Sequence, residues 1–243
     1  MSLLPIPAGI ATLETTLAKP LFDPAQLPID AIAGEPPLPH ERLTPGWLRE
    51  RFARPAGWLP ETADESRAVK AHPVPASVLV PLVLRPQGIS VLLTQRTAHL
   101  NDHAGQVAFP GGRAEHDDVD AVDTALRETE EEIGLHRRHI EILGTLPLYY
   151  TGTGYAVTPV VGLVAPPFEL KADPFEVAEI FEVPLRFLMD GAHHEVRSAT
   201  PPAADGEPGR PAKRTFYTMP YEGHFIWGAT AGMLRNLFHF LRA

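Results

Sequence analysis

The sequence contains no cysteine among its 243 residues. Disulfide bonds, thiolate metal sites and cysteine nucleophiles are therefore excluded as sources of its stability or its chemistry. Long hydrophobic runs are missing as well: the longest apolar stretch, residues 74–84, is short and interrupted by proline, whereas a membrane-spanning helix needs about 20 apolar residues. The first residues have neither a basic start nor a long apolar run, so we expect no secretory signal and a cytoplasmic location.

Positive charge is scarce relative to negative charge. The chain has 21 Lys and Arg against 30 Asp and Glu, which gives a net charge of −9. Nucleic-acid binding depends on a basic surface that neutralises phosphates, so we do not expect nucleic acid as the partner. A polyanionic small-molecule substrate would have to be attracted locally, by a metal ion and a few basic groups, against the overall field.

The N-terminal part of the chain is rich in proline and weakly patterned. We interpret residues 1–72 as an extension, either packed on the main domain or partly disordered, and residues 73–243 as the main domain. Two short helices are predicted in the extension, at residues 8–18 and 45–52. The second has Thr44 as its N-cap and Pro45 at its first helical position.

The main domain is predicted to contain a mixed sheet. Residues 74–86 and 89–96 are separated by a Pro-Gln-Gly turn and predict two adjacent antiparallel strands. The first of them is almost continuously apolar, so it should lie at the centre of the sheet. Further strands are expected at residues 107–109, 140–149, 157–164, 176–183, 214–219 and 224–227. A short helix should follow at 184–189, and residues 199–213 have the composition of a loop.

Two longer helices are predicted from apolar residues at helical spacing. The first runs from about residue 119 or 120 to 133, and the second covers residues 229–241. The expected buried positions are Val122, Ala125, Leu126, Thr129 and Ile133 in the first helix and Met233, Leu234, Leu237 and Leu241 in the second. Mixed strands with one helix in the middle and one at the end predict an α/β sandwich.

The first of these helices carries a cluster of carboxylates. Glu128, Glu131 and Glu132 stand at helical offsets of three and four, so they share one face. Like charges at these offsets weaken a helix by roughly a few tenths of a kcal/mol per pair. A solvated acidic surface is one explanation. The other is a hard cation with oxygen ligands, for which Mg²⁺ or Mn²⁺ is suited.

The residues around the cluster favour a site. Gly111 and Gly112 come before the helix and permit a tight turn with close approach to a ligand. Arg127 stands directly before the first glutamate, and Gly134 fits a left-handed C-terminal cap. Loop, helix, acids and cap therefore indicate one functional site.

This arrangement resembles the Nudix box, whose generic form is G-x5-E-x7-R-E-U-x-E-E-x-G-U, with U aliphatic. In the first half, counted from Gly112, Asp118 takes the place of the glutamate, and eight residues separate it from Arg127. Thr129 fills a position that is usually aliphatic. The second half matches at Arg127, Glu128, Glu131, Glu132, Gly134 and Leu135.

The segment before the box is similar to a signature of the coenzyme A pyrophosphatase branch of the Nudix superfamily, L-L-T-x-R-(S/A)-x3-R-x3-G-x3-F-P-G-G. Thr97 replaces a smaller residue, and Asn101 stands where the signature has an arginine. An aspartate in the box and a longer spacer are also familiar in this branch. Segments 154–162, 176–185 and 224–234 resemble the same branch. The signature residues that match are Leu92, Leu93, Thr94, Arg96, Gly105, Phe109, Pro110, Gly111 and Gly112.

The resemblance implies a Nudix-type α/β/α sandwich with a mixed β-sheet and a role for each site residue. Glu128, Glu131 and Glu132 would hold the metal together with the main-chain carbonyl of Gly111, and Arg127 would hold a catalytic carboxylate in place. Glu176 falls where many Nudix enzymes offer a further ligand or base. Weaker candidates are Arg96, Arg113 and Gly112 for substrate binding, His99 and His103 in the signature loop, and Tyr155 and Phe109 for stacking on adenine.

The resemblance implies an enzyme that cleaves the diphosphate of coenzyme A or its derivatives to 3′,5′-ADP and 4′-phosphopantetheine, with Mg²⁺ or Mn²⁺. A Nudix hydrolase of another nucleoside diphosphate derivative, such as ADP-ribose or a dinucleotide, is the alternative that Asn101 keeps open. A nucleotide-binding Nudix module without turnover is a third possibility. Such modules usually lose box glutamates, and here all three are present.

Overall fold

The computed structural model describes residues 23–61, 72–99, 104–200 and 213–243. The predicted helix at residues 8–18 lies outside these ranges, as does most of the predicted loop at 199–213. The helical elements are η1 (Pro24–Gln26), η2 (His40–Leu43), α1 (Pro45–Ala53), α2 (Ala121–Ile133), η3 (Arg137–His139), α3 (Leu185–Leu188), η4 (Gly191–His193) and α4 (Gly228–Arg242). The strands are β1 (Ala31–Ile32), β2 (Val74–Arg85), β3 (Gly88–Arg96), β4 (Val107–Ala108), β5 (Gly111–Arg113), β6 (Ile140–Thr145), β7 (Tyr149–Tyr150), β8 (Tyr155–Val164), β9 (Val177–Pro184), β10 (Glu195–Ala199), β11 (Arg214–Tyr221) and β12 (His224–Trp227).

The larger sheet is mixed and has the order β4-β3-β2-β8-β6, with β5 paired to β2, β7 to β8 and β9 to β3. Strand β2 pairs antiparallel with β3 and parallel with β8 over ten residues on each strand. This confirms the predicted mixed sheet and the central position of its first, apolar strand. Continuous apolar sequence suits β2 because neighbours cover both of its faces.

The predicted strand at residues 140–149 is wrong as a single element. Strand β6 ends at Thr145, and β7 begins again at Tyr149, both paired to β8. The register shifts between Ile142 and Gly144, and Pro147 in the connection has no N–H to donate to a ladder.

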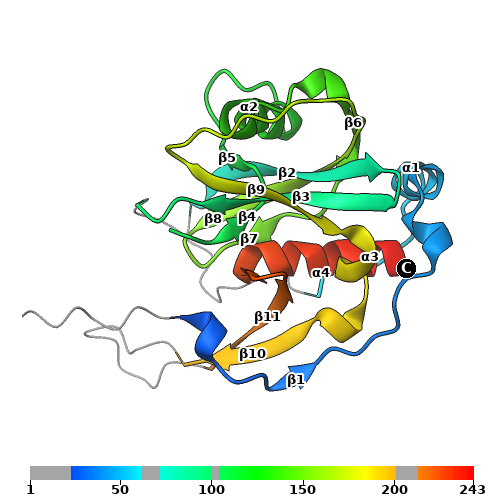
Figure 1. Cartoon of the computed structure of the whole chain (residues 1–243), viewed down its shortest axis with the longest axis vertical. Coiled ribbons are helices and arrows are strands. Elements are labelled where there is room, and N and C mark those ends of the chain that lie inside the picture. Colours follow the sequence, from blue (N-terminus) through cyan, green and yellow to red (C-terminus); the bar gives the residue numbers. More distant parts are fainter. Residues whose placement is uncertain (1–22, 62–71, 100–103, 201–212) are drawn as a thin grey trace, which may run out of the picture.

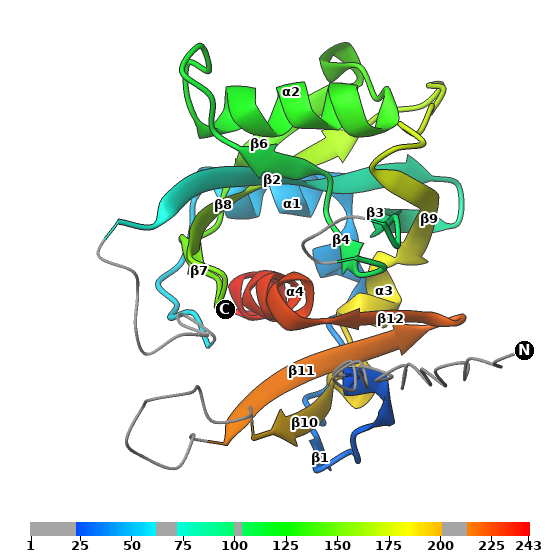
Figure 2. The ribbon, with the colours of Figure 1, turned by 90° about the vertical axis from the view of Figure 1, so that its left-hand side faces the viewer.

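The elements stack in layers (Figures 1 and 2). Helix α2 lies on one face of the larger sheet, and α4 lies on the other face. A second, four-stranded sheet with the order β1-β10-β11-β12 covers α4 from the far side. The α/β/α sandwich is therefore confirmed, with a further sheet outside it. No helix in the described ranges has the length and apolar character needed to cross a membrane.

Helix α4 is buried on nearly its whole circumference because a sheet lies on each side of it. Its four predicted core positions, Met233, Leu234, Leu237 and Leu241, are all buried, which confirms that prediction. The predicted hairpin is also confirmed, as β11 and β12. Strand β10 was not predicted, because Glu-Val-Arg-Ser-Ala is polar and only its central residue is buried.

Helix α2 begins and ends close to its predicted limits. The Asp120 side chain accepts a hydrogen bond from the main chain of Asp123, and Gly134 caps the other end with a left-handed φ of 69°.

The predicted buried stripe of α2 is only partly correct. Ala125, Thr129 and Ile133 are buried, but Val122 and Leu126 are partly exposed, and Thr124 and Glu132 are buried instead. Apolar spacing misses the last two because their burial depends on hydrogen bonds to residues outside the helix.

Residues 23–61 lie against the rest of the chain. Strand β1 pairs with β10, and Leu38, Leu43 and Leu48 belong to the main hydrophobic core. The predicted helix at residues 45–52 is confirmed as α1, with Thr44 as N-cap. The division into an extension (1–72) and a main domain (73–243) stays a prediction.

Arg235 of α4 forms ion pairs that hold the segment of residues 23–61 against the core. Its fully buried guanidinium binds the carboxylates of Glu35, at 2.7 Å, and Glu61, at 2.5 Å. It also lies 2.9 Å from His194 Nδ1, while His194 Nε2 lies 2.8 Å from the Leu188 carbonyl. A guanidinium only donates, so Nδ1 accepts and the proton sits on Nε2. Burial, with Arg235 adding to it, lowers the pKa of His194 to about 4.

Candidate active site

A tight glycine turn brings the carboxylate helix against the sheet. Gly111 has a φ of +151°, and a Cβ at this position would lie 2.4 Å from the carbonyl oxygen of Ser77 on β2. Only glycine therefore allows β5 to pair with β2 here. At Gly112 a Cβ would lie 2.5 Å from the carboxylate carbon of Glu128, so this side chain packs directly on the main chain of the turn.

The three predicted metal-binding glutamates differ in their surroundings. Glu132 is only 4% exposed, and its Oε2 accepts a hydrogen bond from the Gly111 N–H at 3.2 Å. Glu128 is partly buried over Gly112, whereas Glu131 is exposed to solvent. The three glutamates thus occupy an exposed, a partly buried and a buried position on one face of α2.

Burial is the main influence on the pKa values of the two less exposed glutamates, Glu128 and Glu132. Burial raises the pKa of Glu132 to about 8. The Gly111 N–H and the Arg96 guanidinium act in the opposite direction and lower this pKa. Burial also raises the pKa of Glu128, where Arg127 acts in the opposite direction. The charge of Glu176 raises both pKa values.

Arg127 organises the exposed side of the site. Its Nε and Nη2 donate to the two oxygens of Asp118 at 2.8 and 3.0 Å. Its Nη1 lies 3.0 Å from Glu128 Oε1 and 2.9 Å from Glu131 Oε2. Asp118 also accepts hydrogen bonds from Thr124 Oγ1 and from the main chain before the helix. These contacts, the Arg127 pair first, hold the pKa of Asp118 well below its usual range.

Asp118 was not among the predicted site residues. Its signal in the sequence is its position in the box, six residues after Gly112. The structure makes it a positioning residue, because it fixes the guanidinium that contacts Glu128 and Glu131.

Two further elements bring predicted residues to the cluster. Arg96, the last residue of β3, places Nη1 3.6 Å from Glu132 Oε1. Glu176 lies just before β9, where its carbonyl accepts a hydrogen bond from the Thr97 N–H at 3.0 Å. Residues that are distant in sequence thus gather around the glutamates of α2.

The remaining candidates are spread more widely. The Arg113 side chain is exposed, and its carbonyl accepts a hydrogen bond from Arg127 at 3.1 Å. Phe109 is 3% exposed in the hydrophobic core, so its suggested role in stacking on adenine is wrong. Tyr155 is partly buried against the same core. His99 is exposed, whereas Asn101 and His103 lie outside the described residues.

The donor set fits a hard divalent cation in its chemistry. It consists of carboxylate oxygens and a nearby main-chain carbonyl, which are the ligands that Mg²⁺ and Mn²⁺ prefer. Burial raises the pKa of Glu132, and a cation bound beside it would stabilise the charged carboxylate. As the side chains stand, no three acidic or imidazole groups in the described ranges converge closely enough to hold a metal ion.

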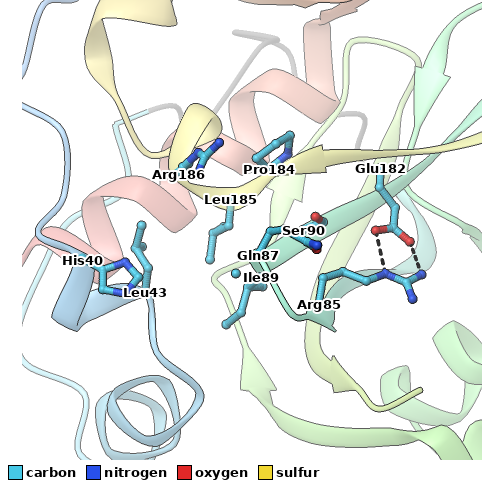
Figure 3. Close-up of a pocket in the computed structure, with 11 residues that line it drawn as sticks. His40, Leu43, Arg85, Gln87, Ile89, Ser90, Glu182, Pro184, Leu185 and Arg186 are labelled. Atoms are coloured by element: carbon cyan, nitrogen blue, oxygen red, sulfur yellow. Dashed lines mark hydrogen bonds and ion pairs between the residues drawn. The ribbon is translucent and has the colours of Figure 1, made fainter. Parts of the chain in front are cut away.

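A separate pocket of about 310 Å³ lies at the opposite end of β3 (Figure 3). Its lining includes His40, Leu185 and the ion pair between Arg85 and Glu182. None of the predicted site residues lines this pocket. The candidate site therefore stays at the carboxylates of α2, which Arg96 and Arg127 contact.

Fold and site together define a class of protein: an α/β/α sandwich in which a glycine turn leads into a carboxylate-bearing helix. The model of the NUDIX domain family matches residues 73–209, which is more than half of the chain. The protein belongs to the Nudix family and is a hydrolase of nucleoside diphosphate derivatives. Nudix hydrolases generally use divalent metals.

Among curated proteins, the chain is similar to "Uncharacterized Nudix hydrolase NudL" of Escherichia coli K12. The two are 42% identical over 163 residues, which cover 67% of this chain and 80% of the relative.

Two solved structures are also similar. One is a MutT/nudix family protein from Enterococcus faecalis, with a TM-score of 0.42 and 17% identity over 79% of this chain and 72% of that one. The other is the NUDIX domain of Shewanella oneidensis NrtR, complexed with ADP ribose. Its TM-score is 0.38 with 21% identity, covering 49% of this chain and 78% of that one.

Proposed function

We propose that this Nudix hydrolase cleaves the diphosphate linkage of coenzyme A or its derivatives, giving 3′,5′-ADP and 4′-phosphopantetheine in the presence of Mg²⁺ or Mn²⁺. The observation that carries the proposal is the signature over residues 92–112, which joins the Nudix box at Gly111 and Gly112. Its Arg96 lies beside Glu132, so the signature and the box contribute to one site.

Glu128, Glu131 and Glu132 would hold the cation, with the carbonyl of Gly111 as a further ligand. When bound, a divalent cation neutralises charge on the phosphoryl oxygens and lowers the pKa of a water molecule. Arg127 supports this set from the side, because its guanidinium is fixed by Asp118 and contacts two of the three carboxylates.

Glu176 completes the acidic site from a different element. Its charge acts on both Glu128 and Glu132, and its role in this proposal is to orient a water molecule or to accept its proton. Arg96 and Arg113 are the cationic groups proposed for the phosphates: Arg96 contacts Glu132, and the Arg113 side chain is exposed at the end of the glycine turn. Gly112 would contribute by letting the Glu128 carboxylate, and the cation it holds, lie close to the main chain.

The second candidate is hydrolysis of another nucleoside diphosphate derivative, such as ADP-ribose or a dinucleotide. Asn101 favours it, because the coenzyme A signature has an arginine there that could pair with a phosphate. A binding module without turnover is disfavoured by the presence of all three box glutamates.

A substrate panel tests these alternatives. Purified full-length protein is assayed with Mg²⁺ and with Mn²⁺ against coenzyme A, acyl-coenzyme A, ADP-ribose and a dinucleotide, and the metal is then removed and restored. We expect metal-dependent release of 3′,5′-ADP from coenzyme A. A kcat/KM much higher for ADP-ribose than for coenzyme A would refute the coenzyme A assignment.

The variant Glu132→Gln tests whether this glutamate takes part in turnover. A catalytic role predicts a loss of orders of magnitude in kcat with little loss of fold, because the amide keeps the shape of the carboxylate. Unchanged turnover in a folded Glu132→Gln protein would remove this glutamate from the mechanism.

A further inference from the structure

Phe175 is a large aromatic side chain left in solvent beside the candidate active site. The residue is 65% exposed, although burying a phenylalanine side chain is strongly favourable. The next residue is Glu176, whose charge acts on both Glu128 and Glu132. An exposed aromatic ring therefore directly precedes, in the chain, a residue whose charge acts on the α2 carboxylates.

The main chain that carries this ring is fixed. The Phe175 N–H donates to Asp173 Oδ1 at 2.8 Å, and Thr97 Oγ1 donates to the Phe175 carbonyl, also at 2.8 Å. Thr97 is buried, and its N–H donates to the Glu176 carbonyl. Because these bonds tie the segment to the end of β3, little main-chain freedom would be lost when a ligand binds the ring.

A second ring lies at the edge of the first. His99 and Phe175 meet edge to face, with ring centroids 4.9 Å apart and planes at 63°. His99 follows β3 three residues after Arg96, whose guanidinium contacts Glu132. The two rings thus come from the two segments that also supply Arg96 and Glu176. An edge-to-face pair leaves ring surface available for a third planar group.

We propose that Phe175, with His99 at its edge, is the base-binding site of this hydrolase and stacks on the nucleobase of the substrate. The inference rests on the proposed function, in which the diphosphate is cleaved at the α2 glutamates. Every nucleobase offers a π-face, so this contact selects nucleoside derivatives over other diphosphates without fixing which base is bound. The base would rest on Phe175 while the diphosphate reaches the carboxylates and Arg96.

The test compares Phe175→Leu, which keeps an apolar side chain but removes the ring, with Phe175→Trp, which keeps a stacking surface. The full chain is assayed with Mg²⁺ on ADP-ribose and coenzyme A. Loss of stacking predicts a roughly 5- to 100-fold rise in KM for Phe175→Leu, with a smaller change in kcat. Phe175→Trp should stay near the wild-type KM. Leu59→Ala, which trims another exposed apolar residue, should change neither constant.

Inhibition separates base recognition from phosphate recognition. Phe175→Leu should weaken competitive inhibition by ADP and leave inhibition by inorganic pyrophosphate unchanged. An unchanged KM in Phe175→Leu overturns the proposal. An equal loss of inhibition by ADP and by pyrophosphate also overturns it, because a merely structural role would affect both ligands alike.

A binding measurement distinguishes failure of this inference from failure of the proposed function. ADP is titrated into metal-free Phe175→Trp, and the fluorescence is compared with that of the wild type, which has three tryptophans. Saturable quenching found only in the variant supports the base site even if no turnover is seen. Turnover of nucleoside diphosphate compounds without such quenching refutes the base site and leaves the hydrolase assignment intact.

Discussion

Gly112→Ala tests whether the position of the Glu128 carboxylate controls turnover. A Cβ at residue 112 would lie 2.5 Å from the Glu128 carboxylate carbon, whereas ordinary contacts begin near 3.4 Å. The carboxylate must therefore retreat by about 1 Å, a displacement that typically reduces catalysis by roughly 100-fold. The φ of Gly112 lies outside the left-handed region, so alanine fits the backbone.

We expect kcat with Mg²⁺ to fall by roughly two orders of magnitude while the midpoint of urea unfolding stays close to the wild-type value. The stability should hold because the obstacle is the far end of a flexible side chain. Gly46→Ala is the matched control: nothing lies within 4 Å of its added methyl group. It should retain full activity.

Gly111→Ala gives the contrasting result. Its methyl group would meet the main chain of β2 at 2.4 Å, at a φ of +151°, so this variant should lose stability as well as activity. The reasoning is refuted if folded Gly112→Ala protein keeps wild-type kcat, because Glu128 would then not need its present position.

Three further predictions concern the charged groups that support the site and the core. Asp118→Asn removes the carboxylate that binds Arg127 through two hydrogen bonds. We expect kcat to fall by more than 10-fold while KM changes less. Wild-type activity in this variant would show that Arg127 keeps its position without Asp118. Arg235→Met leaves the carboxylates of Glu35 and Glu61 without their buried partner. The variant should lower the free energy of unfolding by about 3–5 kcal/mol. A urea midpoint like that of the wild type would show that Arg235 does not stabilise the contact between the N-terminal segment and the core. In the folded protein the pKa of His194 is about 4, below the value of about 6.5 in an unfolded chain. Between these two pH values the unfolded chain binds more protons than the folded protein. The free energy of unfolding should therefore decline as pH falls through this window. Urea titrations at pH 7 and pH 5 should show this decline, and His194→Gln should reduce the difference; an equal decline in both proteins would assign it to other groups.

The chemistry of the active-site helix could be predicted from the sequence because its determinants are local. The spacing of Glu128, Glu131 and Glu132 sets their common face, and Asp120 and Gly134 set the limits of the helix. Gly111 and Gly112 could also be recognised, because two adjacent glycines indicate a turn that other atoms approach closely.

Other features depend on segments that meet only in the folded chain. Hydrogen bonds to Thr97 hold Phe175 and Glu176 beside the end of β3, and no spacing in the sequence encodes that contact. The prediction of the buried positions of α2 was partly wrong for the same reason. Glu132 is buried because its carboxylate accepts a hydrogen bond from the Gly111 N–H and pairs with the Arg96 guanidinium.

By itself, the sequence determined the α-helices of the described ranges, the central apolar strand and the acidic residues of the box, because periodicity and residue type act over a few neighbouring positions. Only the tertiary structure decided that α4 lies between two sheets and that Arg235 joins the N-terminal segment to the core. It also decided which of three similar glutamates is buried. Burial and electrostatic potential are set by everything that surrounds a side chain, and most of those neighbours are distant in sequence.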